Sequence, residues 1–135
     1  MSTATDISNH NFKNFYEASL WAKQNIVGCY KNKSTGIDIT VSKKAIDKYL
    51  SSSAVLKSVS MDAHLSVLRI LPYLIEDAIL KEIHEDRDRN KDIKGILRFY
   101  SAINYQSQAY SVKITVKAYL TGNKAYSYEV IKKAR

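Results

Sequence analysis

The residues of this chain that could perform chemistry are concentrated between positions 79 and 131. His84 is of the residue type that most often acts as a general acid or base. Arg98 could hold a phosphate through two parallel hydrogen bonds, and Tyr100 and Thr115 could donate further bonds to the charge that builds up on it. We predict catalytic roles for these four residues in metal-independent RNA cleavage. In that reaction a base removes the ribose 2′-OH proton and an acid protonates the leaving 5′-oxygen.

A sheet would bring these residues together, and the sequence predicts one. Four strands are expected, at Ile79–Glu85, Ile93–Tyr105, Ala109–Tyr119 and Lys124–Ile131. In the second and third strands apolar and polar side chains alternate strictly, which is typical of strands with one buried face and one open face. The polar candidates fall on the open face.

The register of each strand decides which side chains share that face. The pattern leaves the register of the first strand open. One alternative has Ile79 and Ile83 pointing inward there, with Tyr126, Tyr128 and Val130 pointing inward in the fourth strand. The open face would then also hold Glu129 and the predicted substrate-binding residues Glu82, Lys113, Lys117 and Ser127. A slip of one residue in the first strand would remove His84 from the site, because alternate side chains point to opposite faces.

The chain before residue 79 is mainly helical in pattern. Helices are expected at 12–26, at 43–50 and from 61 onward with a kink or break at Pro72, short strands at 27–31 and 37–41, and a connection at 51–60. The predicted fold class is α+β, with N-terminal helices packed on one face of a four-stranded antiparallel sheet formed by residues 79–131. Residues 1–11 are expected to be a flexible lead-in, and residues 12–135 a single α+β ribonuclease-like domain.

A second histidine, His64, could contribute to substrate binding. It lies one turn before Leu68 on the edge of the apolar stripe of its helix. That position is more typical of a packed histidine, and the alternative is that His64 faces the active site. We count it among the predicted substrate-binding residues.

No metal and no cofactor are expected. The charged loop at 86–92 has Asp86, Asp88, Asn90 and Asp92 at every second position, a faintly calcium-like spacing. It lacks the sixth-position glycine and the closing glutamate of a calcium loop, and its basic side chains would oppose a cation. We therefore predict a metal-independent protein.

The charge of the chain suggests an anionic partner. The net charge is +8, and the isoelectric point is near 9.5. Residues 109–135 hold six lysines and arginines against one glutamate, together with four tyrosines. Basic and aromatic side chains together suit RNA, in tRNA or other single-stranded regions. The alternative is that the lysines keep an edge strand soluble.

The composition is that of an ordinary globular domain. It is 45% hydrophobic and 25% charged, with no apolar run long enough for a membrane span, so no membrane partner is expected. No secretory signal is visible, which favours a cytoplasmic location. The single cysteine, Cys29, excludes an internal disulfide.

Several segments, taken in order, resemble a domain of phage and mobile-element polyvalent proteins. They are Ser42–Ser51, Glu82–Asp86, Ile93–Tyr100, Val112–Lys117 and Tyr126–Val130. That group is linked to the barnase–EndoU–colicin–RelE ribonuclease fold, and the likeness covers roughly residues 36–131.

The resemblance implies helices behind a four-stranded antiparallel sheet whose open face cuts RNA to a cyclic phosphate without a metal. It also implies that the domain serves as a toxin or in conflict between mobile elements and their hosts. By position it implies site roles for His84, for Arg98 with Tyr100, and for Lys113 with Thr115.

Two other functions fit the same pattern. The first is a non-catalytic nucleic-acid-binding accessory domain, which would bind in a salt-dependent way without cleavage. The second is a protein-interaction module whose basic face meets an acidic immunity-type protein.

Overall fold

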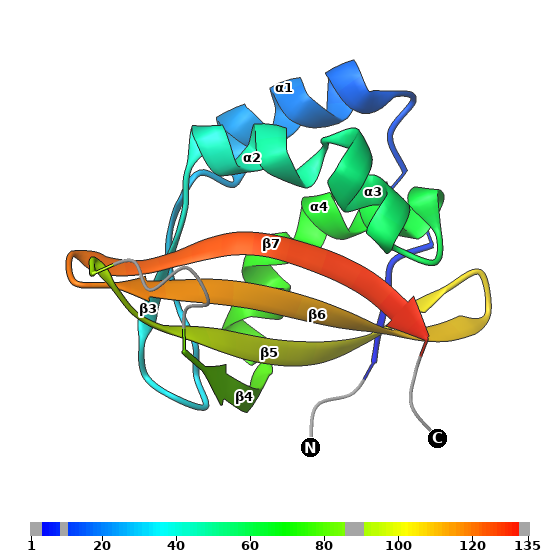
Figure 1. Ribbon diagram of the computed structural model, residues 1–135. Coiled ribbons are helices and arrows are strands. Elements are labelled where there is room, and N and C mark those ends of the chain that lie inside the picture. The colour runs from blue at the N-terminus through cyan, green and yellow to red at the C-terminus, as the bar shows by residue number, and fades with distance from the viewer. Residues whose placement is uncertain (1–3, 9–10, 86–90, 133–135) are drawn as a thin grey trace.

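The computed structural model describes residues 4–8, 11–85 and 91–132 and gives an α+β fold (Figure 1). Along the chain the elements are β1 (Thr5–Asp6), α1 (Phe15–Asn25), β2 (Gly28–Lys31), β3 (Asp38–Val41), α2 (Lys43–Tyr49), α3 (Ser52–Lys57), α4 (Met61–Asp77), β4 (Ile79–His84), β5 (Ile93–Tyr105), β6 (Gln108–Tyr119) and β7 (Gly122–Lys132). The strands from β4 onward lie where the sequence pattern predicts strands.

The strands form one mixed sheet of seven. Its order is β1-β5-β6-β7-β3-β2, and β4 pairs with β5 on the same edge as β1. From β4 to β7, each strand pairs with the next in antiparallel orientation. β1 pairs with β5, and β3 with β7, in parallel. The prediction of a four-stranded antiparallel sheet formed by residues 79–131 is therefore wrong, because those strands are part of a larger mixed sheet.

The three additional strands are short, and two of them pair with strands far away in the sequence. β2 and β3 have 4 residues each and lie where the sequence predicts short strands at 27–31 and 37–41, whereas β1 has 2 residues, too few for an alternating pattern. Thr5 pairs with Ile103, and Thr40 with Lys124. A local pattern can predict the hairpin of β2 and β3, but it carries no signal for these long-range parallel contacts.

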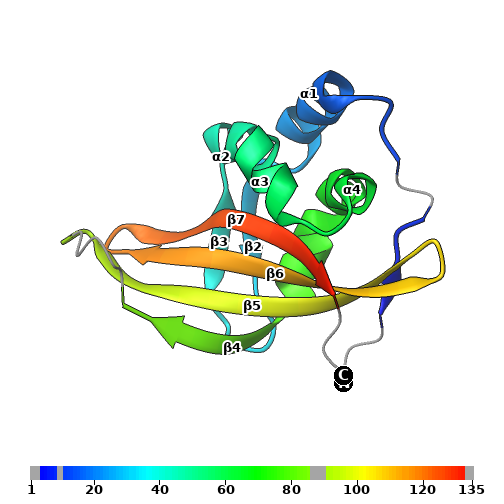
Figure 2. The same ribbon diagram turned by 45° about the vertical axis from the view of Figure 1, so that its right-hand side comes forward.

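The helices cover one side of β5–β7 and leave the other side open (Figures 1 and 2). α2 and α3 contact β7, while α4 contacts β2, β5 and β7. β2 and β3 rise steeply behind the long strands, so the sheet curls around α4 (Figure 2). The covered face buries Phe99, Ile114 and Tyr128 against Leu68 and Leu71 of α4.

Each helix begins at a residue whose side chain caps it. Ser42, Ser51 and Ser60 accept hydrogen bonds from the backbone N–H three residues later, as Asn14 does at α1. The second of these caps starts α3, where the sequence predicts only a connection; the helix has 6 residues, too few for a clear period. α4 continues through Pro72 without the expected break into two helices.

The turn between β2 and β3 holds the end of α4. The Asn32 side chain is fully buried and donates to the backbone oxygens of Ile75 and Ala78, at 2.8 Å in both cases. These carbonyls lie at the end of the helix, where the chain offers them no further helical partner. Since Ile79 starts β4, this contact also fixes where the first strand of the open face begins.

Part of the expected flexible lead-in is built into the sheet. Thr5 and Asp6 form β1, Ile7 is fully buried, and its backbone N–H donates to the Asn104 oxygen at 2.9 Å. Residues 4–8 are therefore an ordered edge of the fold, whereas residues 1–3 and 9–10 lie outside the described part of the chain.

Candidate functional site

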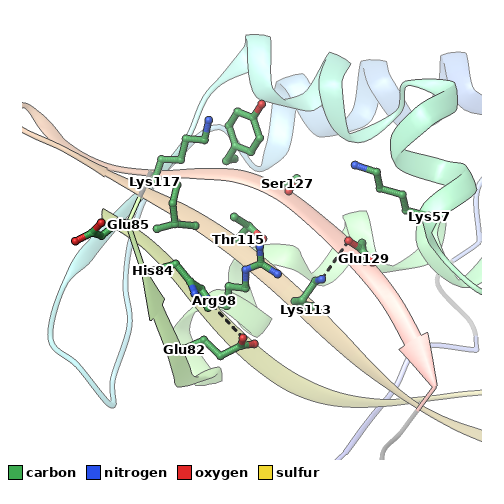
Figure 3. A pocket seen from close by; sticks show the side chains of 12 residues that line it. Lys57, Glu82, His84, Glu85, Arg98, Lys113, Thr115, Lys117, Ser127 and Glu129 are labelled. Carbon is green, nitrogen blue, oxygen red and sulfur yellow. Dashed lines mark hydrogen bonds and ion pairs between the residues drawn. The ribbon is translucent and has the colours of Figure 1, made fainter. Parts of the chain in front are cut away.

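A groove of about 560 Å³ runs over the open face (Figure 3). Its lining consists of Lys57, Glu82, His84, Glu85, Ile96, Arg98, Lys113, Thr115, Lys117, Tyr126, Ser127 and Glu129. All the sequence-predicted site residues line it except Tyr100 and His64. Their proposed roles remain predictions, but the pattern correctly brought most of the set together.

The pairing of the strands sets these side chains in rows across the sheet. Glu82 pairs with Arg98, Arg98 with Thr115, and Thr115 with Ser127. Side chains of directly opposite residues are neighbours on one face. This row places a carboxylate, a guanidinium and two hydroxyl groups in line across β4 to β7.

The neighbouring row lies two residues away along each strand. Tyr100 pairs with Lys113, and Lys113 with Glu129. The Lys113 Nζ lies 3.3 Å from Glu129 Oε1, and both side chains are partly exposed. On the other side of the first row, His84 pairs with Ile96, which pairs with Lys117.

Glu82 links the histidine to a tyrosine. The Nε2 of His84 lies 3.0 Å from Glu82 Oε2, and the Tyr100 hydroxyl donates a short hydrogen bond to Glu82 Oε1. The bond from Tyr100, followed by that from His84, lowers the pKa of Glu82. Burial, followed by the bond to Glu82, raises the pKa of Tyr100 to about 12. At neutral pH Glu82 is therefore a carboxylate that accepts from both neighbours, which orients the His84 ring.

Arg98 occupies the middle of the groove with a donor to spare. Its Nε is buried and has no hydrogen-bond partner in the described part of the chain. A buried donor without a partner is costly and uncommon in a folded chain, and the guanidinium group that carries it lines the groove. Arg98 lies between His84 on one side and the Lys113–Glu129 pair on the other (Figure 3). The arrangement favours an anion at the centre of the groove.

A family model described as large polyvalent protein-associated domain 3 matches residues 10–126. The chain belongs to this family. The match agrees with the resemblance to a polyvalent-protein domain of mobile elements, but it gives no support for a ribonuclease fold. No curated protein and no solved structure matches the chain.

His64 of this polyvalent protein-associated domain lies in the core and not in the groove. It is fully buried and stacks on the Tyr128 ring, with 4.3 Å between ring centroids. Its Nε2 donates to the Tyr49 carbonyl at 2.7 Å, so Nδ1 accepts from the Ser58 hydroxyl at 2.6 Å. Burial lowers its pKa, against the opposing effects of the Tyr49 bond and Glu129. We therefore assign it a packing role in place of the expected substrate contact.

The expected inward positions hold only in part. Tyr128 and Val130 are buried, but Ile79 and Ile83 are 43% and 71% exposed because β4 is an edge strand. Tyr126 lines the groove, since the β6–β7 register shifts between Thr115 and Val116 and Ala125 takes the buried position. A bulge of this kind leaves no mark in an alternating pattern.

Four residues that line the groove were not predicted from the sequence, namely Lys57, Glu85, Ile96 and Tyr126. Lys57 comes from the end of α3, which the pattern did not predict. Ile96 shares the open face with Arg98 two residues later, but it is apolar and does not belong to the polar set that the pattern picks out. The tyrosine could have been suspected from the excess of lysine and tyrosine in residues 109–135.

The described residues of the domain contain no group of three or more His, Cys, Asp or Glu placed to hold a metal ion. Residues 86–90 of the charged loop lie outside the described part of the chain. None of the described helices combines the length and apolar character that a membrane span requires.

Proposed function

We propose that the groove binds RNA and cleaves it without a metal, by attack of a ribose 2′-OH on the neighbouring phosphate. The observation that carries the proposal is the Arg98 guanidinium, which lines the groove between His84 and Glu129 and whose Nε has no hydrogen-bond partner in the described part of the chain. An arginine can present two parallel N–H groups to a phosphate, so Arg98 would hold the reacting group. Thr115, its direct cross-strand neighbour, would donate a further hydrogen bond.

Two groups on either side of Arg98 would transfer the protons. Binding of the phosphate to Lys113 would release the Glu129 carboxylate, which then takes the proton from the 2′-OH. The 2′-oxygen attacks phosphorus, and the P–O5′ bond breaks as protonated His84 gives its Nδ1 proton to the 5′-oxygen. The products are a 2′,3′-cyclic phosphate and a 5′-hydroxyl. Glu82, held by Tyr100, would keep His84 oriented.

The test is incubation of the purified protein with tRNA and single-stranded RNA in the presence of EDTA. Cleavage products should carry 2′,3′-cyclic phosphate ends, and an RNA with deoxyribose at the cleaved position should stay intact because it lacks the nucleophile. Arg98→Gln should lose both cleavage and tight binding. Lys94→Gln, which removes a lysine from the same strand outside the groove, is the matched control. Intact RNA at high concentrations of folded wild-type protein would contradict the proposal.

A second candidate function is RNA binding without cleavage. It is favoured by the pairing of both carboxylates, since Glu82 already accepts from two side chains and Glu129 is held by Lys113. Such a face would bind phosphates as a static surface. It predicts salt-dependent binding that Arg98→Gln weakens, with no product formed from any RNA.

A further inference from the structure

A second hollow adjoins the groove, and Tyr126 borders both. It lies between α2 and β7 and has a volume of about 760 Å³. Its lining includes Lys44, Lys48 and Lys124 together with one acid, Asp47. That acid is already paired with Lys23 at 2.7 Å, so the unpaired charges facing the hollow are positive.

Tyr126 holds two lysines where the hollows meet. The Lys48 Nζ lies 3.5 Å from the centre of its ring, and the Lys117 Nζ lies 3.7 Å from it. The first lysine comes from α2 and the second from β6, so the ring joins elements that are far apart in the sequence. Attraction to the ring face offsets the mutual repulsion of the two ammonium groups. The two lysines also lower the pKa of the Tyr126 phenol, and the hydrogen bond with Lys48 has the largest effect.

A second aromatic ring and a second cation also line the hollow. The Lys124 Nζ lies 5.0 Å from the centre of the Tyr119 ring, and both residues line the hollow. Tyr119 is only partly buried, so part of its ring is available for stacking. Aromatic rings beside cations suit single-stranded nucleic acid, whose bases stack while its phosphates meet the charges.

We infer that a single-stranded RNA continues from the groove past Tyr126 into the second hollow, where Lys48 and Lys124 bind a further phosphate. This inference rests on the proposed RNA-binding function of the groove. It adds a substrate requirement, because the strand must be unpaired and long enough to reach beyond the phosphate at Arg98. A base adjacent to the second phosphate would stack on Tyr119.

The test uses 2′-O-methyl RNA oligonucleotides of increasing length, which the groove cannot cleave, and fluorescence anisotropy. For wild-type protein, affinity should rise about tenfold at the length that reaches the second hollow. Lys48→Gln/Lys124→Gln should lose that gain but bind the shortest oligonucleotides as the wild type does. The slope of log affinity against log salt should fall by about 0.7 for each phosphate that the variant no longer neutralises.

Lys13→Gln/Lys33→Gln removes the same charge from exposed positions outside both hollows and should keep the gain with length. An equal loss in this control would overturn the second phosphate site, because only net charge would then matter. A wild-type affinity that does not depend on length would also overturn it while leaving the groove proposal intact. Loss of short-oligonucleotide binding in Arg98→Gln tests the groove separately. If the wild type binds no oligonucleotide, both proposals fall.

Tyr126 provides an independent check. Tyr126→Phe keeps the ring between the two lysines and should retain the gain in affinity with length. Tyr126→Leu removes the ring and should lose most of the gain. If both variants match the wild type, the tyrosine does not organise the hollow and the inferred path past it is wrong.

Discussion

His64 and His84 lie on opposite sides of the sheet and illustrate its two faces. His64 is fully buried on the helix side, with both ring nitrogens bonded and its ring stacked on Tyr128. His84 lies on the open side with its side chain 48% exposed, and one nitrogen is bonded to Glu82. The same residue type therefore stabilises the fold on one face and is available to a ligand on the other. The surroundings of each residue distinguish the two roles.

The largest expected effect is on RNA cleavage by the open face. If His84 is the general acid, His84→Ala should slow cleavage by about 10²- to 10⁴-fold, because proton transfer contributes a factor of that size. The free energy of unfolding of His84→Ala should differ from that of the wild type by no more than about 0.5 kcal/mol, as for other exposed positions. Initial rates of product formation and denaturant titrations measure the two quantities. Equal rates for His84→Ala and the wild type would remove His84 from the mechanism.

The covered face should respond in the opposite way. His64→Ala should lower the free energy of unfolding by about 3 kcal/mol, because it leaves a cavity and removes the bonds to Tyr49 and Ser58. At a temperature where the variant is folded, cleavage should persist. Urea unfolding followed by tyrosine fluorescence measures the change. A stability loss no larger than that of His84→Ala would mean that the two faces do not differ as described.

The pH dependence of stability should come from the buried histidine. Burial lowers the pKa of His64 below its usual 6.5, so the unfolded chain takes up a proton that the folded chain resists. Stability should therefore be complete above about pH 6.5 and should fall as the pH decreases below it, by at most about 1.4 kcal/mol per pH unit.

His64→Gln is the control for this dependence, since other titrating groups are common to both proteins. Unfolding free energies at pH 7.5 and 5.5 should differ less in the variant than in the wild type. An identical difference in the two proteins would show that His64 is not the source.

The smallest expected effect on stability is that of losing an open-face ion pair. Glu129→Gln removes the partner of Lys113, and partly exposed pairs contribute about 0–1 kcal/mol to stability. The variant should therefore unfold almost as the wild type does, but its cleavage rate should fall if Glu129 is the base. A stability loss as large as that of His64→Ala would show that the groove, too, is built for stability.

The sequence predicted the long strands and the open-face set well, because their signal is local. Apolar and polar side chains alternate over much of Ile93–Tyr105, and β5 has those bounds. The same alternation assigned Arg98, Lys113 and Thr115 to one face, and the structure brings them together in the groove. A long strand with one covered face leaves little freedom of register.

What could not be predicted depends on contacts between distant segments. The place of β3 in the sheet is set by its parallel pairing with β7, and that of β1 by Ile103 of β5. Tyr126 reaches the groove only because a bulge shifts its strand. His64 has the sequence environment of a half-exposed helix residue, and its burial depends on contacts with Tyr49, Ser58 and Tyr128, which come from other segments. None of these contacts follows from a periodic pattern.

The Nε–H resonance of Arg98 in isotope-labelled protein tests the central claim most directly, because this donor lies in the groove without a partner among the described residues. The protein would be titrated with 2′-O-methyl RNA while that resonance is followed by NMR. An RNA-binding groove predicts that the Arg98 signal shifts, while signals of the core around His64 stay in place. An unchanged Arg98 resonance at saturating RNA would contradict the proposed role of the open face.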